Sequence, residues 1–300
     1  MRKLVNNKSL FRNVAQAHAG ANSTDPAHKI RHFKDSDKSS QRPRVIRSSQ
    51  CSVYSRFCAA DLTLIPSLDS TADLEELVSG ARDLKISFVR ATVFGPDANT
   101  ETSLGSTGLR LMSAAAHQRG LYLVSEVLET RYLKLMQEFC DVLEITPRNF
   151  GDEGLLRAVG ETDKTVIIYR NPRHSVSEFL KAVEIVERAG QAKIVIGDKG
   201  SYYPFAESLA ELDLSSLLSI REQTPYPLIV DVRGIAKRSL QVEVLAQAAL
   251  VVGVDGLVLG FGRRGKNISM EMLRSLKQKL DAIRFTFQAM NHIGREAVNK

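Results

Sequence analysis

The sequence predicts an α/β fold, a (β/α)8 TIM barrel with a basic, flexible N-terminal extension. Two observations lead to this prediction. Between about residue 61 and residue 280, eight short runs rich in β-branched residues alternate with runs of helical periodicity. Several short runs, such as 166–168 and 228–230, are apolar at every position, which is typical of parallel strands covered by helices. Eight strand–helix units of this length fit the usual size of a TIM barrel.

The predicted elements follow one another at regular spacing. Strands are expected at 62–66, 86–94, 121–127, 142–146, 165–170, 193–197, 228–232 and 256–260. Helices are expected at 73–84, 108–119, 130–139, 176–189 and 240–252, with a last helix from about 269 toward 290. Gly120, Gly190 and Gly253 directly follow three of them, where a glycine commonly ends a helix. An open doubly wound sheet is disfavoured because no Gly-x-Gly-x-x-Gly turn follows the first strand.

We divide the chain into a basic N-terminal extension, residues 1–58, and the barrel with its C-terminal helix, residues 59–300. Residues 1–50 hold eleven Lys and Arg against three Asp and Glu, so the net charge of +7 comes from the extension. Apolar residues are sparse there, and a disordered tail is expected. The alternative is organelle targeting through residues 1–24, since no acidic residue precedes Asp25.

The segregated charge also favours a partner for the extension, because such a basic arm usually docks on a protein or another acidic partner. The arm has few aromatic residues for base stacking, which disfavours sequence-specific RNA recognition. No apolar run reaches the roughly 18 residues of a membrane-spanning helix, so no membrane partner is expected. Without targeting, the expected location is cytoplasmic.

Motifs along the predicted barrel match those of a known family. They are Val89-Arg90 followed by Phe94, Pro96 and Gly105; Val124-Ser125-Glu126-Val127; Asp141-Val142-Leu143-Glu144-Ile145 with Pro147-Arg148-Asn149; Asp198-Lys199-Gly200; Pro227-Leu228-Ile229-Val230-Asp231; and Gly253-Val254-Asp255-Gly256-Leu257. In this order they resemble the 3-deoxy-7-phosphoheptulonate (DAHP) synthase family, which has an aldolase-type barrel, over roughly residues 61–280. Sister sugar-acid synthases that act on arabinose 5-phosphate share this barrel.

The resemblance implies a transferase of aromatic amino acid biosynthesis, which condenses phosphoenolpyruvate with erythrose 4-phosphate. The family holds a divalent metal with a Cys, a His, a Glu and an Asp. Here Ser67 stands at the Cys position and Gly234 at the His position, while 257–261 and 262–267 contain no carboxylate. We therefore expect no metal cofactor and a degenerate member of the family, a pseudoenzyme with a binding, regulatory or structural role.

The substrate cations change as well. The family's Lys-Pro-Arg-Thr-Ser loop becomes Gly-Pro-Asp-Ala-Asn at 95–99, and Tyr169 replaces a lysine. The remaining candidates to bind a phosphorylated or carboxylated small molecule are Glu126, Arg148, Asn149, Arg170, Lys199 and Asp231. Two alternatives stay open: a divergent active synthase, and an enzyme with changed, metal-free chemistry on an anionic ligand. The resemblance also implies a homo-oligomer.

Overall fold

The structure is a computed structural model that describes residues 52–59, 61–68, 73–92, 105–190, 192–201, 210–262 and 265–298, with side chains to residue 287. The basic segment 1–51, and with it our expectations of a disordered, targeting or docking arm, lies outside these residues. No helix in the described ranges is long and apolar enough to cross a membrane.

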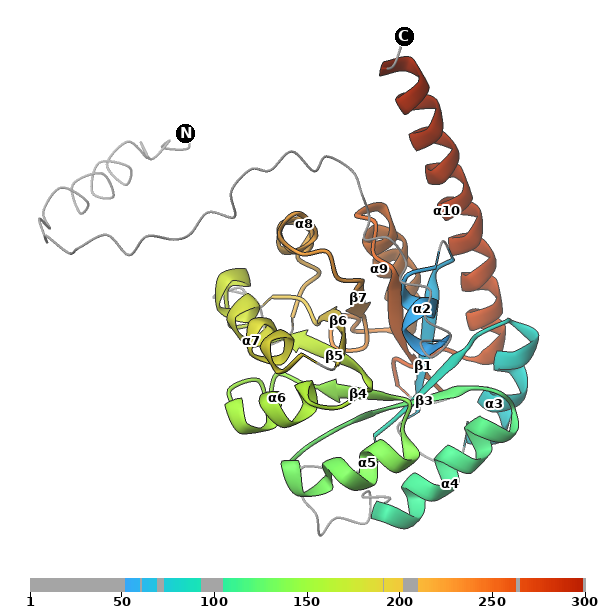
Figure 1. The fold of residues 1–300 in the computed structure, drawn as a ribbon. Helices are drawn as coiled ribbons and strands as arrows, with labels where there is room; N and C mark the ends of the chain where they lie inside the picture. The colour runs from blue at the N-terminus through green and yellow to red at the C-terminus, as the bar shows by residue number, and fades with distance from the viewer. Residues whose placement is uncertain are drawn as a thin grey trace, which may run out of the picture. The chain divides into compact units, whose positions relative to one another are not determined.

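Eight parallel strands close into a barrel in sequence order, and β1 pairs with β8 to complete the ring (Figure 1). The strands are β1 (Thr63–Leu68), β2 (Phe88–Ala91), β3 (Tyr122–Glu126), β4 (Val142–Ile145), β5 (Thr165–Arg170), β6 (Lys193–Asp198), β7 (Leu228–Asp231) and β8 (Gly256–Phe261). All eight overlap the strands expected from the sequence. The (β/α)8 barrel prediction is therefore confirmed.

Helices surround the ring of strands (Figure 1). They are α2 (Ser52–Phe57), α3 (Leu74–Asp83), α4 (Gly105–Gln118), α5 (Leu133–Phe139), α6 (Glu153–Gly160), α7 (Val176–Ala189), α8 (Leu214–Gln223), α9 (Ser239–Val251) and α10 (Met270–Val298), with a 3-10 turn, η2 (Thr130–Tyr132), before α5. Gly120, Gly190 and Gly253 have positive φ, as their predicted positions at helix ends require.

Three of these helices, α2, α6 and α8, are absent from the sequence-based assignment. The α6 helix has only eight residues and is capped by the preceding Asp152, whose carboxylate accepts a hydrogen bond from the Leu155 amide at 2.9 Å. The α8 sequence, Leu-Ser-Ser-Leu-Leu-Ser-Ile-Arg-Glu-Gln, is rich in serine and buries only Leu217 and Ile220. A short or serine-rich helix gives a weak periodic signal, because few of its positions must be apolar.

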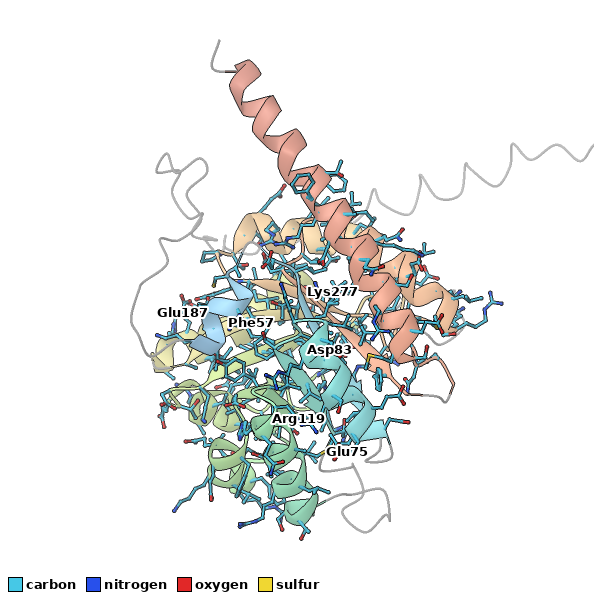
Figure 2. All side chains as sticks on the ribbon, turned by 90° about the vertical axis from the view of Figure 1, so that its right-hand side faces the viewer. Phe57, Glu75, Asp83, Arg119, Glu187 and Lys277 are labelled. Carbon is cyan, nitrogen blue, oxygen red and sulfur yellow. The ribbon has the colours of Figure 1, made fainter. Side chains whose placement is uncertain are left out.

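Side chains that point into the barrel form a dry apolar layer near the amino ends of the strands. The layer is separate from the core between strands and helices, and it consists of Ile65, Phe88, Val124, Val142, Ile167, Val195, Ile229 and Val258. Below it lies Phe57 of α2, whose ring centroid is 4.8 Å from that of Phe88 and whose side chain is fully buried (Figure 2). The α2 helix therefore closes the amino-terminal end of the barrel.

This closure bears on where the barrel begins in the sequence. We place the boundary between extension and barrel at residues 58 and 59, and that division stays a prediction. The structure adds that α2, which precedes it, supplies Phe57 to the interior, and that Thr63 of β1 donates a hydrogen bond to the Arg56 carbonyl at 2.9 Å. Residues 52–57 thus pack as part of the barrel.

Candidate functional site

A polar layer lies directly above the apolar one, at the carboxyl ends of the strands. Side chains on a strand alternate between its two faces, so the residue two positions after each inward apolar residue also points inward. These positions hold Ser67, Arg90, Glu126, Glu144, Tyr169 and Asp231, with Gly197 and Gly260 on the remaining two strands. In a TIM barrel this end carries the active site, so the polar layer is the candidate site.

Arg90 and Glu144 form a buried ion pair at the centre of this layer. The Arg90 Nε donates to Glu144 Oε2 at 2.7 Å, and both side chains are almost wholly shielded from solvent. The Tyr169 hydroxyl donates to the other Glu144 oxygen at 3.0 Å. Burial and the Glu144 carboxylate raise the pKa of Tyr169 well above its usual range, so the phenol stays protonated.

Asp231 is held by two cations on the other side of the layer. Arg233 donates to both of its oxygens, at 2.9 Å and 2.7 Å, and Lys199 Nζ donates to Oδ2 at 3.0 Å. Burial alone would raise the pKa of Asp231, but Arg233 and Lys199 outweigh it and lower that pKa well below its usual range. Asp231 therefore stays ionised, and its pairing is lost only in strong acid.

The two clusters meet at Ser67 of β1. The Ser67 hydroxyl accepts a hydrogen bond from Arg90 Nη1 at 3.2 Å and one from Arg233 Nη1 at 2.8 Å. Two guanidinium groups thus converge on one neutral side chain. Together the two clusters contain three cations, Arg90, Lys199 and Arg233, and two carboxylates, Glu144 and Asp231, and Glu126 of β3 adds a third carboxylate to the layer.

Aromatic and amide side chains fill the remaining space at the strand ends. The Tyr169 ring lies where the Cβ of a residue larger than Gly197 would be, and Lys199 Nζ is 4.4 Å from the centre of that ring. Across the barrel, the side-chain amide of Asn267 lies against Gly260 in the same way. The glycines at 197 and 260 thus leave the space that the neighbouring side chains of Tyr169 and Asn267 occupy.

A second buried pair, Arg170 and Asp198, lies between β5 and β6. Arg170 Nε donates to Asp198 Oδ2 at 2.6 Å, while its Nη atoms donate to the carbonyls of His174 and Gly200 and to the Ser201 hydroxyl. Burial raises the pKa of Asp198 in spite of the neighbouring guanidinium. Arg170 thus donates its hydrogen bonds to acceptors within the protein. These bonds connect the two strand ends to the loops after them.

The predicted site residues divide into three groups. Lys199 and Asp231 lie in the polar layer, whereas Arg170 is engaged in the separate buried pair. Glu126 also lies in this layer and accepts a hydrogen bond from Thr146 at 2.6 Å, whereas the Asn149 amide donates to the carbonyls of Val127 and Leu128 and so orients a loop. Arg148 is exposed and has no hydrogen-bond partner within the described ranges.

The centre of the layer includes Arg90 and Glu144, which are not among the ligand-binding candidates expected from the sequence. A usable signal was present: Arg90 and Glu144 each follow an inward apolar residue by two positions in a strand. The segment 93–104, which includes the altered loop at 95–99, lies outside the described residues, and so do two arginines of the loop after β8, Arg263 and Arg264.

The donor set at the mouth does not fit a divalent metal. The hydroxyl at Ser67 faces two guanidinium groups, Gly234 has no side chain, and β8 is apolar from Gly256 to Phe261. In the residues that the structure describes, no three His, Cys, Asp or Glu side chains come together as a metal-binding group. A cation at this position would meet two positive charges instead of anionic ligands.

The fold and this strand-end site can now be compared with known proteins. The model of the DAHP synthetase I family matches residues 102–291, which is more than half of the chain. The chain belongs to the DAHP synthetase I family. Its relatives include a phospho-2-dehydro-3-deoxyheptonate aldolase of Thermotoga maritima, 26% identical over 231 residues that cover 72% of this chain and 68% of the relative.

A second relative is a 2-dehydro-3-deoxyphosphooctonate aldolase of Syntrophotalea carbinolica. It is 27% identical over 166 residues, which cover 50% of this chain and 57% of that protein. The crystal structure of the Thermotoga maritima DAHP synthase superposes with a TM-score of 0.71 at 25% identity, covering 75% of this chain and 70% of that one. The family assignment and the aldolase-type barrel expected from the motifs are thus confirmed. The functional question is whether the site still supports the reaction of this family.

Proposed function

We propose that this chain is a pseudoenzyme of the DAHP synthetase I family, with a binding, regulatory or structural role in place of the metal-dependent condensation. The observation that supports this proposal is the pair of guanidinium groups on Ser67, the residue at the position where the family resemblance expects a metal-binding cysteine. Arg233 brings its positive charge to this position and binds Asp231, so the interactions at the site are internal to the protein.

Electrostatics supports the proposal further. A divalent ion close to the Arg90 and Arg233 guanidinium groups would be repelled by both, and this repulsion is strong where water is excluded. Arg90 and Asp231 are buried, and Arg233 is only slightly exposed. Arg90, Lys199 and Arg233 each have a carboxylate partner within the protein, which supports a layer whose charges are paired without a metal.

The assay of the family reaction tests this proposal. We expect no loss of the phosphoenolpyruvate absorbance when the folded protein is incubated at high concentration with manganese and either erythrose 4-phosphate or arabinose 5-phosphate. A melting curve establishes that the sample is folded. Steady consumption that a chelator stops would show a divergent active synthase, and the proposal would then be abandoned.

A second candidate function, binding of an anionic small molecule without a metal, is favoured by an exposed cation at the mouth. Arg148 lies after β4 at this end of the barrel and has no hydrogen-bond partner among the described residues. A carboxylate or phosphate group would neutralise that charge and accept hydrogen bonds from it. This candidate is compatible with the loss of the condensation.

Thermal unfolding in the presence of single anions tests the second candidate. We expect phosphoenolpyruvate or inorganic phosphate to raise the melting temperature, as any ligand does that binds only the folded state. Arg148→Ala should reduce the shift, whereas Arg157→Ala, which removes another exposed arginine, on α6, should leave it unchanged. No shift with any of these anions, or equal shifts in both variants, would argue against an anion site at Arg148.

A further inference from the structure

A groove on the outside of the barrel is separate from the polar layer at the strand ends. It lies between α9 and α10, beside the first turns of both helices, and its volume is about 220 Å³. The α10 helix crosses the side of the molecule that faces the viewer in Figure 2. A cavity of roughly 150 Å³ can already hold a benzene molecule. The groove is therefore large enough for the apolar body of a small ligand.

The inner wall of the groove is apolar. Val242 of α9, Leu276 of α10 and Ile268, which precedes α10, are buried behind it. Met272 adds a partly buried thioether side chain, which is flexible enough to adapt to the shape of a ligand. A hydrocarbon group in the groove would thus exchange contact with water for contact with apolar side chains.

Polar groups without partners surround this apolar wall. The side chains of Ser239, Glu271 and Ser275 line the groove, and none of them forms a hydrogen bond or ion pair with another described residue. An apolar recess with a few polar groups directed at it is the usual composition of a small-molecule site. The groove therefore has both an apolar surface and free polar groups to offer a ligand.

The charge of the groove favours a cation. Its lining contains two carboxylates, Glu243 and Glu271, and no Lys, Arg or His side chain among the described residues. Lys279 and Gln247 both donate to Glu243 Oε1, at 2.7 Å and 3.2 Å, so Glu243 Oε2 has no partner in the described part of the chain. An ammonium group could donate charge-assisted hydrogen bonds to such carboxylate oxygens.

An anion fits less well, although amino ends of helices often bind anions. At the start of α10 the amides of Met272 and Leu273 already donate to the hydroxyl and the carbonyl of Ser269, at 3.3 Å and 2.9 Å. Glu271 already places a negative charge in this first turn. The carboxylate of a zwitterion, such as an amino acid, would be repelled by Glu243 and Glu271.

We propose that the α9–α10 groove binds a small aliphatic ammonium ion. The hydrocarbon part lies against Val242 and Leu276, and the ammonium group donates hydrogen bonds to Glu271. No residue that lines the groove belongs to the polar layer. The proposal therefore holds whether or not the chain retains the condensation reaction, and its test is separate from the enzyme assay.

Thermal unfolding of the full chain with four related compounds tests this proposal. Isopentylammonium chloride at about 20 mM should raise the melting temperature by about 2 °C or more, as a ligand with a millimolar dissociation constant does. Ammonium chloride lacks the hydrocarbon, 3-methylbutan-1-ol lacks the charge, and leucine adds a carboxylate. Each should give less than half of that shift at the same concentration. If the alcohol or leucine is as effective as the amine, the proposed charge recognition is wrong.

Two pairs of variants locate the binding site. Glu271→Gln should remove at least half of the shift, whereas Glu222→Gln, which changes an exposed glutamate on α8, should leave it unchanged. Ser275→Leu retains Glu271 but fills the groove, so it should abolish the shift. Ser215→Leu, at an exposed serine of α8, is the matched control. No shift in the wild type, or a shift that survives both Glu271→Gln and Ser275→Leu, would overturn the proposal.

Discussion

Arg170→Met is expected to lower the free energy of unfolding by about 3–5 kcal/mol, because it leaves Asp198 buried without its counter-ion. It also removes the donors that the Ser201 hydroxyl and the carbonyls of His174 and Gly200 accept from. Denaturant unfolding at neutral pH measures the loss. The exposed pair of Arg188 and Glu184 on α7 provides the comparison, since Arg188→Met should cost no more than about 0.5 kcal/mol.

The pH dependence of this variant gives an independent check. Burial already raises the pKa of Asp198 when Arg170 is present, and removal of the guanidinium raises it further. A carboxyl group whose pKa is higher in the folded state than in the unfolded state stabilises the fold as the pH falls. Arg170→Met should therefore lose less stability at pH 5 than at pH 8, relative to the wild type, and an equal loss at both would contradict a charged Asp198 as the cause.

Gly197→Ala is the substitution with the second largest expected effect, about 1–3 kcal/mol of destabilisation. The added methyl group would overlap the ring of Tyr169, which is fully buried and fixed by its hydrogen bond to Glu144. A flexible side chain could move away at little cost, but a ring fixed in the barrel interior requires its neighbours to shift. The loss is measured as a change in the denaturant midpoint.

Two further variants isolate the cause of that loss. Tyr169→Ala in the Gly197→Ala background should make the glycine substitution less costly than it is in the wild type, because the overlapping ring is absent. Gly234→Ala is the matched control at the same end of the barrel, since its added methyl group meets nothing within 4 Å. If Gly197→Ala costs the same with and without the tyrosine ring, the overlap is not its cause.

The fold could be predicted from the sequence because its strands are buried on both faces, against the helices and in the barrel interior. In β5, Val166 and Ile168 face the helices while Ile167 faces the barrel interior, so the whole run must be apolar. The α8 helix was missed for the opposite reason, since its outer face carries serines and exposed leucines and its inner face needs only two apolar residues. Helical periodicity is visible in a sequence only where successive turns of the helix must each bury apolar residues.

The position of the site could be predicted from the sequence, but the contacts between its side chains could not. Barrel topology placed Lys199 and Asp231 at the strand ends, where the structure also has them. Arg90 and Glu144 are 54 residues apart in the sequence, and only the register of the strands from β2 to β4 brings them into contact. Whether a cation such as Arg170 is free for a ligand depends on such contacts, and composition does not contain that information.

The helix α2 makes the two ends of the barrel different, because it closes one of them. Because Phe57 closes the amino-terminal end of the barrel, the chain enters the domain on the side opposite the strand ends that hold Ser67 and Asp231. A tag, surface anchor or fused protein attached ahead of α2 therefore joins the barrel at its sealed end. Attachment directly ahead of α2 would leave the polar end of the barrel facing away from the attachment point, which suits surface-based screens for whatever that end binds.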